Sequence, residues 1–167
     1  MTLATHGVVG ATIAVVWPTQ PLLAIGLAFL SHFPLDAIPH WDYPISSLDK
    51  EEAARGTVRM QWGRGFVIDL VRIGADGLLG LFLALVVREL SVTYISLWWV
   101  MAGAVAGMLP DGLQFVYGRL GGRVLGFIQR IHNFFHTSWR LSGRPIVGIG
   151  SQIMLVVVIL GLVVWLG

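Results

Sequence analysis

The distribution of hydrophobic residues divides the chain into five apolar segments, which cover residues 4–17, 21–38, 66–88, 94–113 and 145–166. A helix needs about 20 apolar residues to cross a bilayer, and the last segment is an almost unbroken run of this kind. The first segment is shorter and stops at Trp17, while the second begins at Pro21, a favourable first position of a helix. The pattern predicts an all-α fold, namely a polytopic membrane helical bundle of four to five transmembrane helices whose first two segments form a hairpin.

Residues 122–139 follow another pattern, in which apolar and polar side chains alternate with helical spacing. Val124 and Phe135 fall on one side of such a helix, whereas His132 and His136 fall on the other. This distribution is typical of a helix that lies along the membrane surface. We therefore expect one interfacial amphipathic helix beside the bundle.

Glycines within the apolar segments indicate where neighbouring helices approach each other. They are Gly103 and Gly107 in the fourth segment, and Gly74, Gly77 and Gly80 in the third. Small residues let helix backbones come close together in membrane bundles. These positions are therefore expected at helix contacts.

The composition supports a membrane protein. Hydrophobic residues make up 56% of the 167 residues and charged residues only 12%, whereas soluble domains carry about 25% charged residues. We interpret residues 1–167 as a single integral-membrane domain. The net charge is only +2 and the basic residues are dispersed, which argues against nucleic acid as a partner. The chain has no cysteine, which excludes disulfides, thiolate zinc sites and cysteine nucleophiles.

The basic residues predict the orientation in the membrane. They gather in the connections at residues 43–65 and 114–144, while the connection at residues 89–93 has only Arg88 beside it. Cytoplasmic connections carry the excess of lysine and arginine, so the amphipathic helix is expected in the cytoplasm as well. Five crossings then place the N-terminus in the cytoplasm and the C-terminus outside, in the inner membrane of a bacterium or archaeon. The first residues lack a basic stretch and a cleavage site, so no removable signal peptide is expected.

The second apolar segment ends in a pattern of possible metal ligands. His32, Asp36 and His40 follow one another at a spacing of four, and residues four apart lie on the same face of a helix. Pro34 and Pro39 disturb such a helix, which weakens the argument for His40 most. Histidines and carboxylates suit Zn²⁺, Mn²⁺ or Fe²⁺. We expect a divalent metal here, zinc in the first place and manganese or iron as the alternatives.

The orientation brings the remaining histidines to the same side of the bundle. His6 begins the first segment there, and His132 and His136 repeat the spacing of four, a common way to hold a metal on a helix. Asp76 lies deeper in the third segment, where an acidic residue is a functional candidate by default. The expected metal ligands are His6, His32, Asp36, Asp76, His132 and His136. Asp111 and His40 are expected as ligands of a second metal or as the general base.

A simpler interpretation stays open for some of these residues. His40 and Asp42 could merely solvate the end of an apolar helix, and Asp36 could cap a break made by Pro34. His6 could be no more than an interfacial residue near the N-terminus. His132 and His136 could merely form the polar face of an interfacial helix.

Several short motifs resemble those of a known family. They are Thr5-His6-Gly7, the SHxxxD pattern that begins at Ser31, Leu109-Pro110-Asp111, and the HxxxHTS pattern that begins at His132. Together they resemble the small bacterial inner-membrane proteins of the membrane-bound metal-dependent hydrolase family. The chain lacks the second aspartate of that family's LPDxD element and the Arg-Gly pair of its HRGxTHS element, and its motifs follow a different order. The resemblance implies a divergent member that carries out metal-dependent hydrolysis.

The sequence therefore favours a metal-dependent hydrolase with a site at the cytoplasmic membrane face. A lipid or a lipid-linked phosphoester is the expected substrate, of the kind that a phosphoesterase or phospholipase cleaves. Arg123, Arg130 and Arg140 are expected to hold an anionic headgroup or phosphate. The expected partners are membrane lipids and a second copy of the chain. A transporter of metal ions or protons, with Asp76 on its pathway, and a non-catalytic membrane scaffold stay open as other classes.

Overall fold

The computed structural model describes residues 1–49, 59–92, 95–137, 139, 141 and 143–166. These residues form six helices and no strand: α1 (Leu3–Val16), α2 (Pro21–Asp36), α4 (Arg64–Leu90), α5 (Leu97–Leu120), α6 (Arg123–Phe135) and α7 (Pro145–Leu166). An isolated antiparallel bridge joins Leu48 to Met60. The prediction of an all-α fold is confirmed for this part of the chain.

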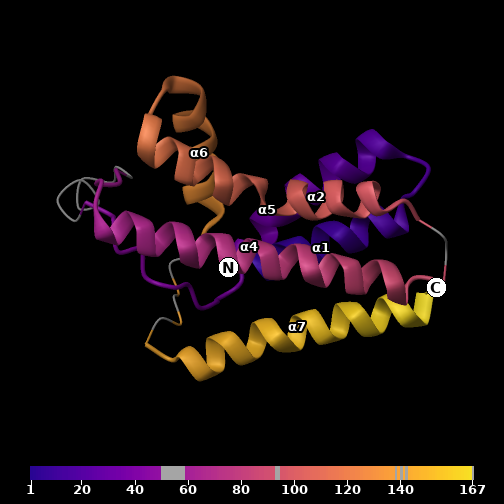
Figure 1. Cartoon of the computed structure of the whole chain (residues 1–167). Helices are drawn as coiled ribbons and strands as arrows, with labels where there is room; N and C mark the ends of the chain where they lie inside the picture. The colour runs from indigo at the N-terminus through magenta and orange to yellow at the C-terminus, as the bar shows by residue number, and fades with distance from the viewer. Residues whose placement is uncertain (50–58, 93–94, 138, 140, 142, 167) are drawn as a thin grey trace.

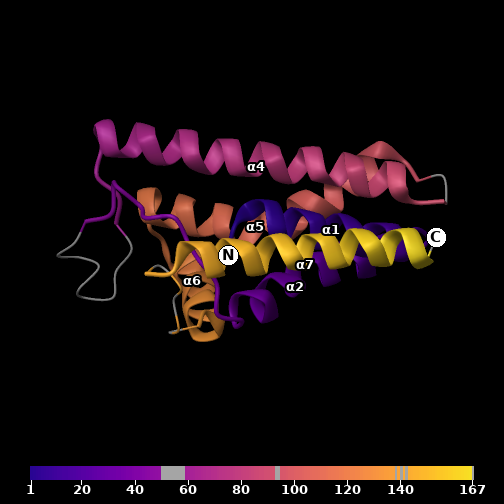
Figure 2. The ribbon, with the colours of Figure 1, turned by 90° about the horizontal axis from the view of Figure 1, so that it is seen from below.

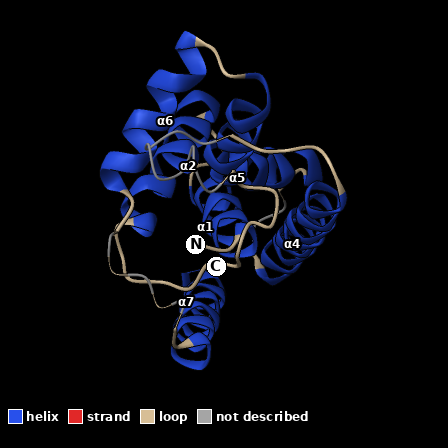
Figure 3. Ribbon diagram, turned by 90° about the vertical axis from the view of Figure 1, so that its left-hand side faces the viewer, coloured by secondary structure: helices blue, strands red, loops and turns tan. Residues whose placement is uncertain are grey.

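Helix α1 is the central element of the bundle, because α2, α4, α5 and α7 all pack against it. These helices run lengthwise, whereas α6 lies across one end (Figures 1 and 2). The connections that precede α4 and α7 lie at this same end, which we call the α6 end, while the connection from α4 to α5 lies at the other (Figure 1). Seen from the α6 end, α4 and α7 stand on the outside of the bundle (Figure 3).

Close contact between α1 and α5 depends on glycine. A Cβ atom on Gly10 would lie 2.2 Å from the carbonyl oxygen of Gly103, and one on Gly107 would lie 2.4 Å from the carbonyl oxygen of His6. Only glycine fits at such distances from another backbone. The expectation for Gly103 and Gly107 is therefore confirmed, whereas a Cβ atom on Gly74 would meet no atom within 4 Å.

Two prolines lie inside helices without ending them. Helix α2 continues through Pro34 and ends at Asp36, so His40 lies beyond it. Helix α5 continues through Pro110 as far as Leu120. The prediction that this segment ends near residue 113 is therefore wrong for the helix, which stops where Gly121 takes a positive φ of 65°.

The outer surface of the bundle is apolar. Within the described residues, α4 and α7 are long and apolar enough to cross a membrane, and α1 and α2 are shorter apolar helices. Large hydrophobic side chains are exposed along the two long helices, including Val71, Leu78, Phe82, Ile146, Met154 and Trp165. Soluble monomers rarely expose contiguous apolar surface on this scale.

Helix α6 confirms the expected amphipathic helix, and its orientation is informative. Its polar residues Gln129 and His132 are buried, while Val124 is 75% exposed and Phe134 is 82% exposed. A helix on a soluble protein buries its apolar side instead. Gln129 and His132 of α6 therefore face the bundle, whereas Val124 and Phe134 face outward. The helix ends at Phe135, one residue before His136.

Candidate metal centre

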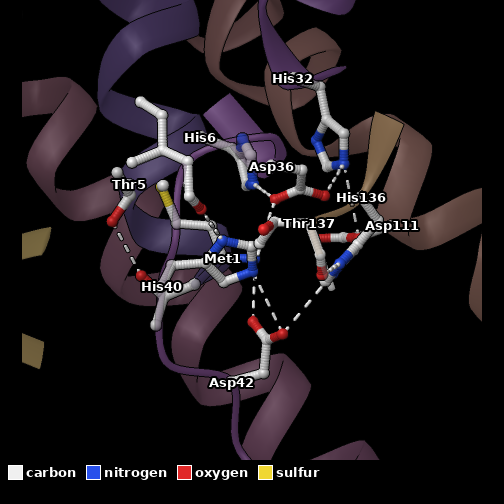
Figure 4. A network of polar contacts seen from close by, with 12 residues as sticks. Met1, Thr5, His6, His32, Asp36, His40, Asp42, Asp111, His136 and Thr137 are labelled. Carbon is white, nitrogen blue, oxygen red and sulfur yellow. Dashed lines mark hydrogen bonds and ion pairs between the residues drawn. The ribbon is translucent and has the colours of Figure 1, made fainter. Parts of the chain in front are cut away.

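Asp36, the last residue of α2, lies at the centre of a polar cluster at the α6 end of the bundle (Figure 4). Its side chain is only 1% exposed. Its Oδ2 atom lies 3.1 Å from Nε2 of His32 and 3.0 Å from Nε2 of His132. Its Oδ1 atom lies 3.1 Å from Nε2 of His6 and 3.9 Å from Nε2 of His40. The two carboxylate oxygens of Asp36 therefore face different histidines.

The first group of possible ligands contains His32, Asp36, Asp111 and His132, whose ligand atoms all lie within 4.8 Å of one another. They come from α2, α5 and α6. Oδ1 of Asp111 lies 3.6 Å from Nε2 of His32 and 3.4 Å from Nε2 of His132. Two imidazoles and two carboxylates that converge in this way form a donor set that suits zinc, manganese or iron.

The hydrogen bond on the far side of the His32 ring orients this ring as a ligand. Its Nδ1–H donates to the carbonyl oxygen of Gly107 at 3.0 Å. With that proton committed, Nε2 of the neutral ring presents a lone pair to Asp36. Two lone pairs repel each other unless a proton or a metal ion lies between them. Metal-binding histidines commonly donate their other N–H to a carbonyl in this manner.

The second group contains Asp36, His40 and His136, again with ligand atoms within 4.8 Å of one another. Nδ1–H of His40 donates at 2.7 Å to the carbonyl two residues earlier, and Nδ1–H of His136 donates at 3.2 Å to the carbonyl of the next residue. Both rings thus present Nε2 to the cluster. Oδ2 of Asp42 lies 3.1 Å from Nε2 of His40 and 3.6 Å from Nε2 of His136. The second group shares Asp36 with the first.

Backbone pairing holds the second group together although His40 lies outside a helix. The N–H of Thr137 donates to the carbonyl of Asp36, and the N–H of Leu141 donates to the carbonyl of His40, each at 2.9 Å. The segment after α2 therefore runs beside the segment after α6. Gln152 of α7 adds a further hydrogen bond, from Nε2 to the carbonyl of Trp41 at 2.9 Å.

His6 borders both groups without belonging to either. Its ring stacks on the ring of His32, with the centroids 3.9 Å apart and the planes at 22°. Nδ1 of His6 and Nδ1 of His132 are buried and have no hydrogen-bond partner among the described residues. Buried polar atoms without partners are rare in proteins, and here both belong to rings of the cluster.

Positive charge is favoured beside the carboxylates of Asp36, Asp42 and Asp111. The amino group of Met1 lies 2.9 Å from Oδ1 of Asp36 and 2.9 Å from Oδ1 of Asp42. Burial alone would lower the pKa of His132, but hydrogen bonds with Asp111 and Asp36 outweigh it and raise this pKa to about 9. The carboxylates therefore create a potential that attracts a proton or a metal cation.

The Asp42 carboxyl is held in its charged form. Burial alone would raise its pKa, but the contacts with the His136 and His40 rings and the positive charge of the Met1 amino group hold this pKa well below its usual range. A charged carboxylate beside two imidazoles is again suited to a cation.

Asp76 lies apart from both groups. Its carboxylate accepts the N–H of Leu3 at 2.6 Å and the N–H of Ala4 at 3.2 Å, so it satisfies the first free donors of α1. Asp69 serves the fold similarly, because its carboxylate accepts the N–H groups of Ser46 and Ser47 at 2.8 and 2.7 Å. The structure brings together the other predicted site residues, which are His6, His32, Asp36, His40, Asp111, His132 and His136.

Sequence reasoning missed the part that Asp42 plays. We interpreted Asp42 only as a residue that could solvate a helix end, whereas its carboxylate contacts two histidines of the second group. The spacing of two between His40 and Asp42 could have indicated it, because alternate residues of an extended segment lie on one side. The carbonyl of Gly107, which orients His32, carries no signal in the sequence.

An apolar groove lies between α2 and α6 beside the cluster. It has a volume of about 280 Å³ and is lined by Phe29, Leu30, Phe33, Pro34, Ile128, Ile131 and Phe135. The ring of Phe33 also packs against His32 and His132, with centroids 5.7 and 6.5 Å apart. One side chain thus separates the groove from the first group of ligands.

No family model, curated protein or solved structure matches the chain.

Proposed function

We propose that the chain is a membrane-embedded, metal-dependent hydrolase with its site at the cytoplasmic membrane face. Its substrate is a lipid or another phosphoester, and the chain is a divergent member of the membrane-bound metal-dependent hydrolases. The observation that carries this proposal is the convergence of His32, Asp36 and His132 in a buried cluster at one end of a bundle with an apolar surface.

The distribution of polar residues supports insertion in a membrane as a bundle of four to five crossings. Among the described residues, His6, His32, His40, His132, Asp36 and Asp69 are buried, while many leucines, valines and phenylalanines are exposed, which is unusual for a soluble protein. Helix α6 turns Val124 and Phe134 outward at the same end as the cluster. A helix with this exposed face is stable in the interface of a bilayer, which would bring the cluster close to lipid headgroups.

The first group supplies both metal ligands and a base. His32, Asp36 and His132 would hold the metal, because three protein ligands leave a position open for water or substrate. Asp111 is 23% exposed, against 1% for Asp36, so it is the more accessible carboxylate and is assigned as the general base. A bound divalent metal would lower the pKa of a water molecule and stabilise charge on a phosphoryl oxygen.

The hydrolysis needs no further reactant. A water molecule adds its oxygen to phosphorus, the bond from phosphorus to the leaving alcohol breaks, and the alcohol departs with a proton. Asp111 would take the proton from the attacking water and return it to the leaving oxygen. The buried histidines position these carboxylates and keep bulk water away.

The groove beside the cluster favours a lipid substrate. Its walls come from α2 and α6, the helices that also supply His32, Asp36 and His132. An acyl chain in the groove would place the attached headgroup at the first group of ligands. Arg123 and Arg130 are exposed on α6 and would attract an anionic headgroup. Arg140, which the sequence predicts to act with them, lies outside the described residues.

The test is turnover of phospholipid by the metal-loaded protein in mixed micelles. Phosphatidic acid, phosphatidylglycerol and a lipid diphosphate are offered with zinc, manganese or iron, and the released alcohol or phosphate is measured. We expect His132→Ala to abolish turnover and Asn133→Ala, its exposed neighbour, to preserve it. Equal rates for these two variants, or no cleavage by the wild type with any metal, would refute the proposal.

A further inference from the structure

The two ligand groups repeat the same design one step apart along two segments of the chain. Each group contains Asp36 and two histidines, one from the segment of α2 and one from the segment of α6. The members of the second group lie four positions after those of the first: Asp36 follows His32, His40 follows Asp36, and His136 follows His132 at this spacing. The hydrogen bonds from Thr137 to Asp36 and from Leu141 to His40 keep the two segments in register over this step.

A second aspartate contacts the histidines of each group: Asp111 is a member of the first group, and Asp42 lies beside the second. Asp111 contacts both histidines of the first group, at 3.6 and 3.4 Å. Asp42 contacts both histidines of the second, at 3.1 and 3.6 Å. Each group therefore offers two imidazoles and two carboxylates, a set that suits a divalent cation.

Asp36 is the element that joins the two groups. Its Oδ2 atom faces His32 and His132, while its Oδ1 atom faces His6 at 3.1 Å, His40 at 3.9 Å and the amino group of Met1. A carboxylate with one oxygen in each of two donor sets is placed to bridge two metal ions.

We propose that the site binds two divalent metal ions, one in each group, with the carboxylate of Asp36 as the bridge between them. The inference rests on the proposed function for the first ion and adds the second. Nδ1–H of His40 and Nδ1–H of His136 are committed to backbone carbonyls, so both rings direct a lone pair at the second position.

Two ions narrow the class of substrate. Metal pairs about 3.5–4 Å apart stabilise the attacking and the leaving oxygen of a displacement at phosphorus together. The second ion therefore favours a phosphoester over a carboxylic ester of the same lipid.

The experiment counts metal ions per chain in the purified full-length protein. The protein is loaded with Mn²⁺, freed of excess metal, and analysed by elemental analysis and by electron paramagnetic resonance. We expect two ions and an exchange-coupled signal in the wild type and in Asn133→Ala. His136→Ala should retain one ion and lose the coupling. If His136→Ala does not fold, Asp42→Asn serves as a second variant, because it is a milder change at a side chain that is 31% exposed. It should lower the affinity for the second ion at least about tenfold.

The outcomes separate this inference from the proposed function. If the wild type binds one ion and neither His136→Ala nor Asp42→Asn changes this number, the proposal of a second ion is wrong and a single-metal hydrolase remains. Two ions without coupling would overturn the bridge by Asp36. No ion in the wild type would overturn the metal site and the proposed function together.

Discussion

The Nε2 atoms of His32 and His132 lie 3.1 Å apart, although the two residues are separated by 100 positions in the sequence. Both atoms also lie within 3.1 Å of Oδ2 of Asp36. Among the described residues, this convergence is the strongest indication of a metal site. Because the Nδ1 proton of His32 is donated to Gly107, the ring is held in the orientation that a metal ligand needs.

Replacement of either histidine should therefore weaken metal binding. We expect His32→Ala and His132→Ala to lower the affinity for zinc by at least about 100-fold, since even loss of the groups that orient a ligand costs about 10–100-fold. Competition with a chromophoric chelator measures the affinity. Asn133→Ala, on the exposed side of α6, serves as the control. An affinity in His132→Ala equal to that of Asn133→Ala would remove His132 from the ligand set.

The contact between α1 and α5 gives a second prediction, which concerns stability. A Cβ atom on Gly103 would lie 2.5 Å from the carbonyl oxygen of Gly10 and 2.6 Å from Cβ of Ala14. Gly103→Ala must therefore push the helices apart, at a cost of about 1–3 kcal/mol. Unfolding in detergent micelles measures the change. Gly74→Ala is the matched control, because the added methyl group would meet no atom within 4 Å; equal stabilities of the two variants would contradict the packing.

Much of the site could be predicted because its spacing is local. His32 and Asp36 lie on one helical turn of α2, and a spacing of four is visible in the sequence. The positive-inside argument predicts that the other histidines lie on the same side of the bundle. In the structure they lie together in one cluster. Apolar periodicity likewise predicts the positions of the helices, apart from the extent of α5.

The rest depends on long-range backbone contacts that leave no pattern in the sequence. His40 lies past Pro39 and outside α2, yet it stays beside His136 because Leu141 hydrogen-bonds to its carbonyl. The sequence predicts Asp76 as a ligand, because an acidic residue within an apolar segment is energetically costly and is therefore a functional candidate. Its partners are backbone N–H groups of α1, which every sequence carries.

The third prediction separates the role of Asp76 from that of the metal ligands. Asp76→Ala removes the acceptor for the N–H groups of Leu3 and Ala4. Loss of a helix cap costs about 0.5–2 kcal/mol, so the free energy of unfolding should fall by this amount. The metal content should stay equal to that of the wild type by elemental analysis. Loss of metal without loss of stability would instead support Asp76 as a ligand.

The fourth prediction concerns orientation in the membrane. The connection from α4 to α5 and the connection from α6 to α7 lie at opposite ends of the bundle (Figure 1). A reporter inserted after Gly143 should therefore read as cytoplasmic and one inserted after Val92 as external, since the basic residues lie on the first side. Alkaline phosphatase and green fluorescent protein fusions measure this. Two signals from the same compartment would refute the crossing of the membrane by α5, and exchanged signals would reverse the orientation.

The final prediction tests the groove as the binding place of an acyl chain. Ile131 lines the groove on α6, next to the ligand His132 but on the apolar side of the helix. Ile131→Trp fills part of the volume of about 280 Å³, and each methylene group excluded from an apolar site costs about 0.8 kcal/mol. We expect KM for a long-chain phospholipid to rise about tenfold or more, while kcat/KM for a soluble short-chain phosphoester stays unchanged. Val124→Trp, at an outward position of the same helix, should leave both substrates unaffected. An equal loss for the two substrates in Ile131→Trp would mean that the change disturbs the ligands, and the groove would then have no part in chain recognition.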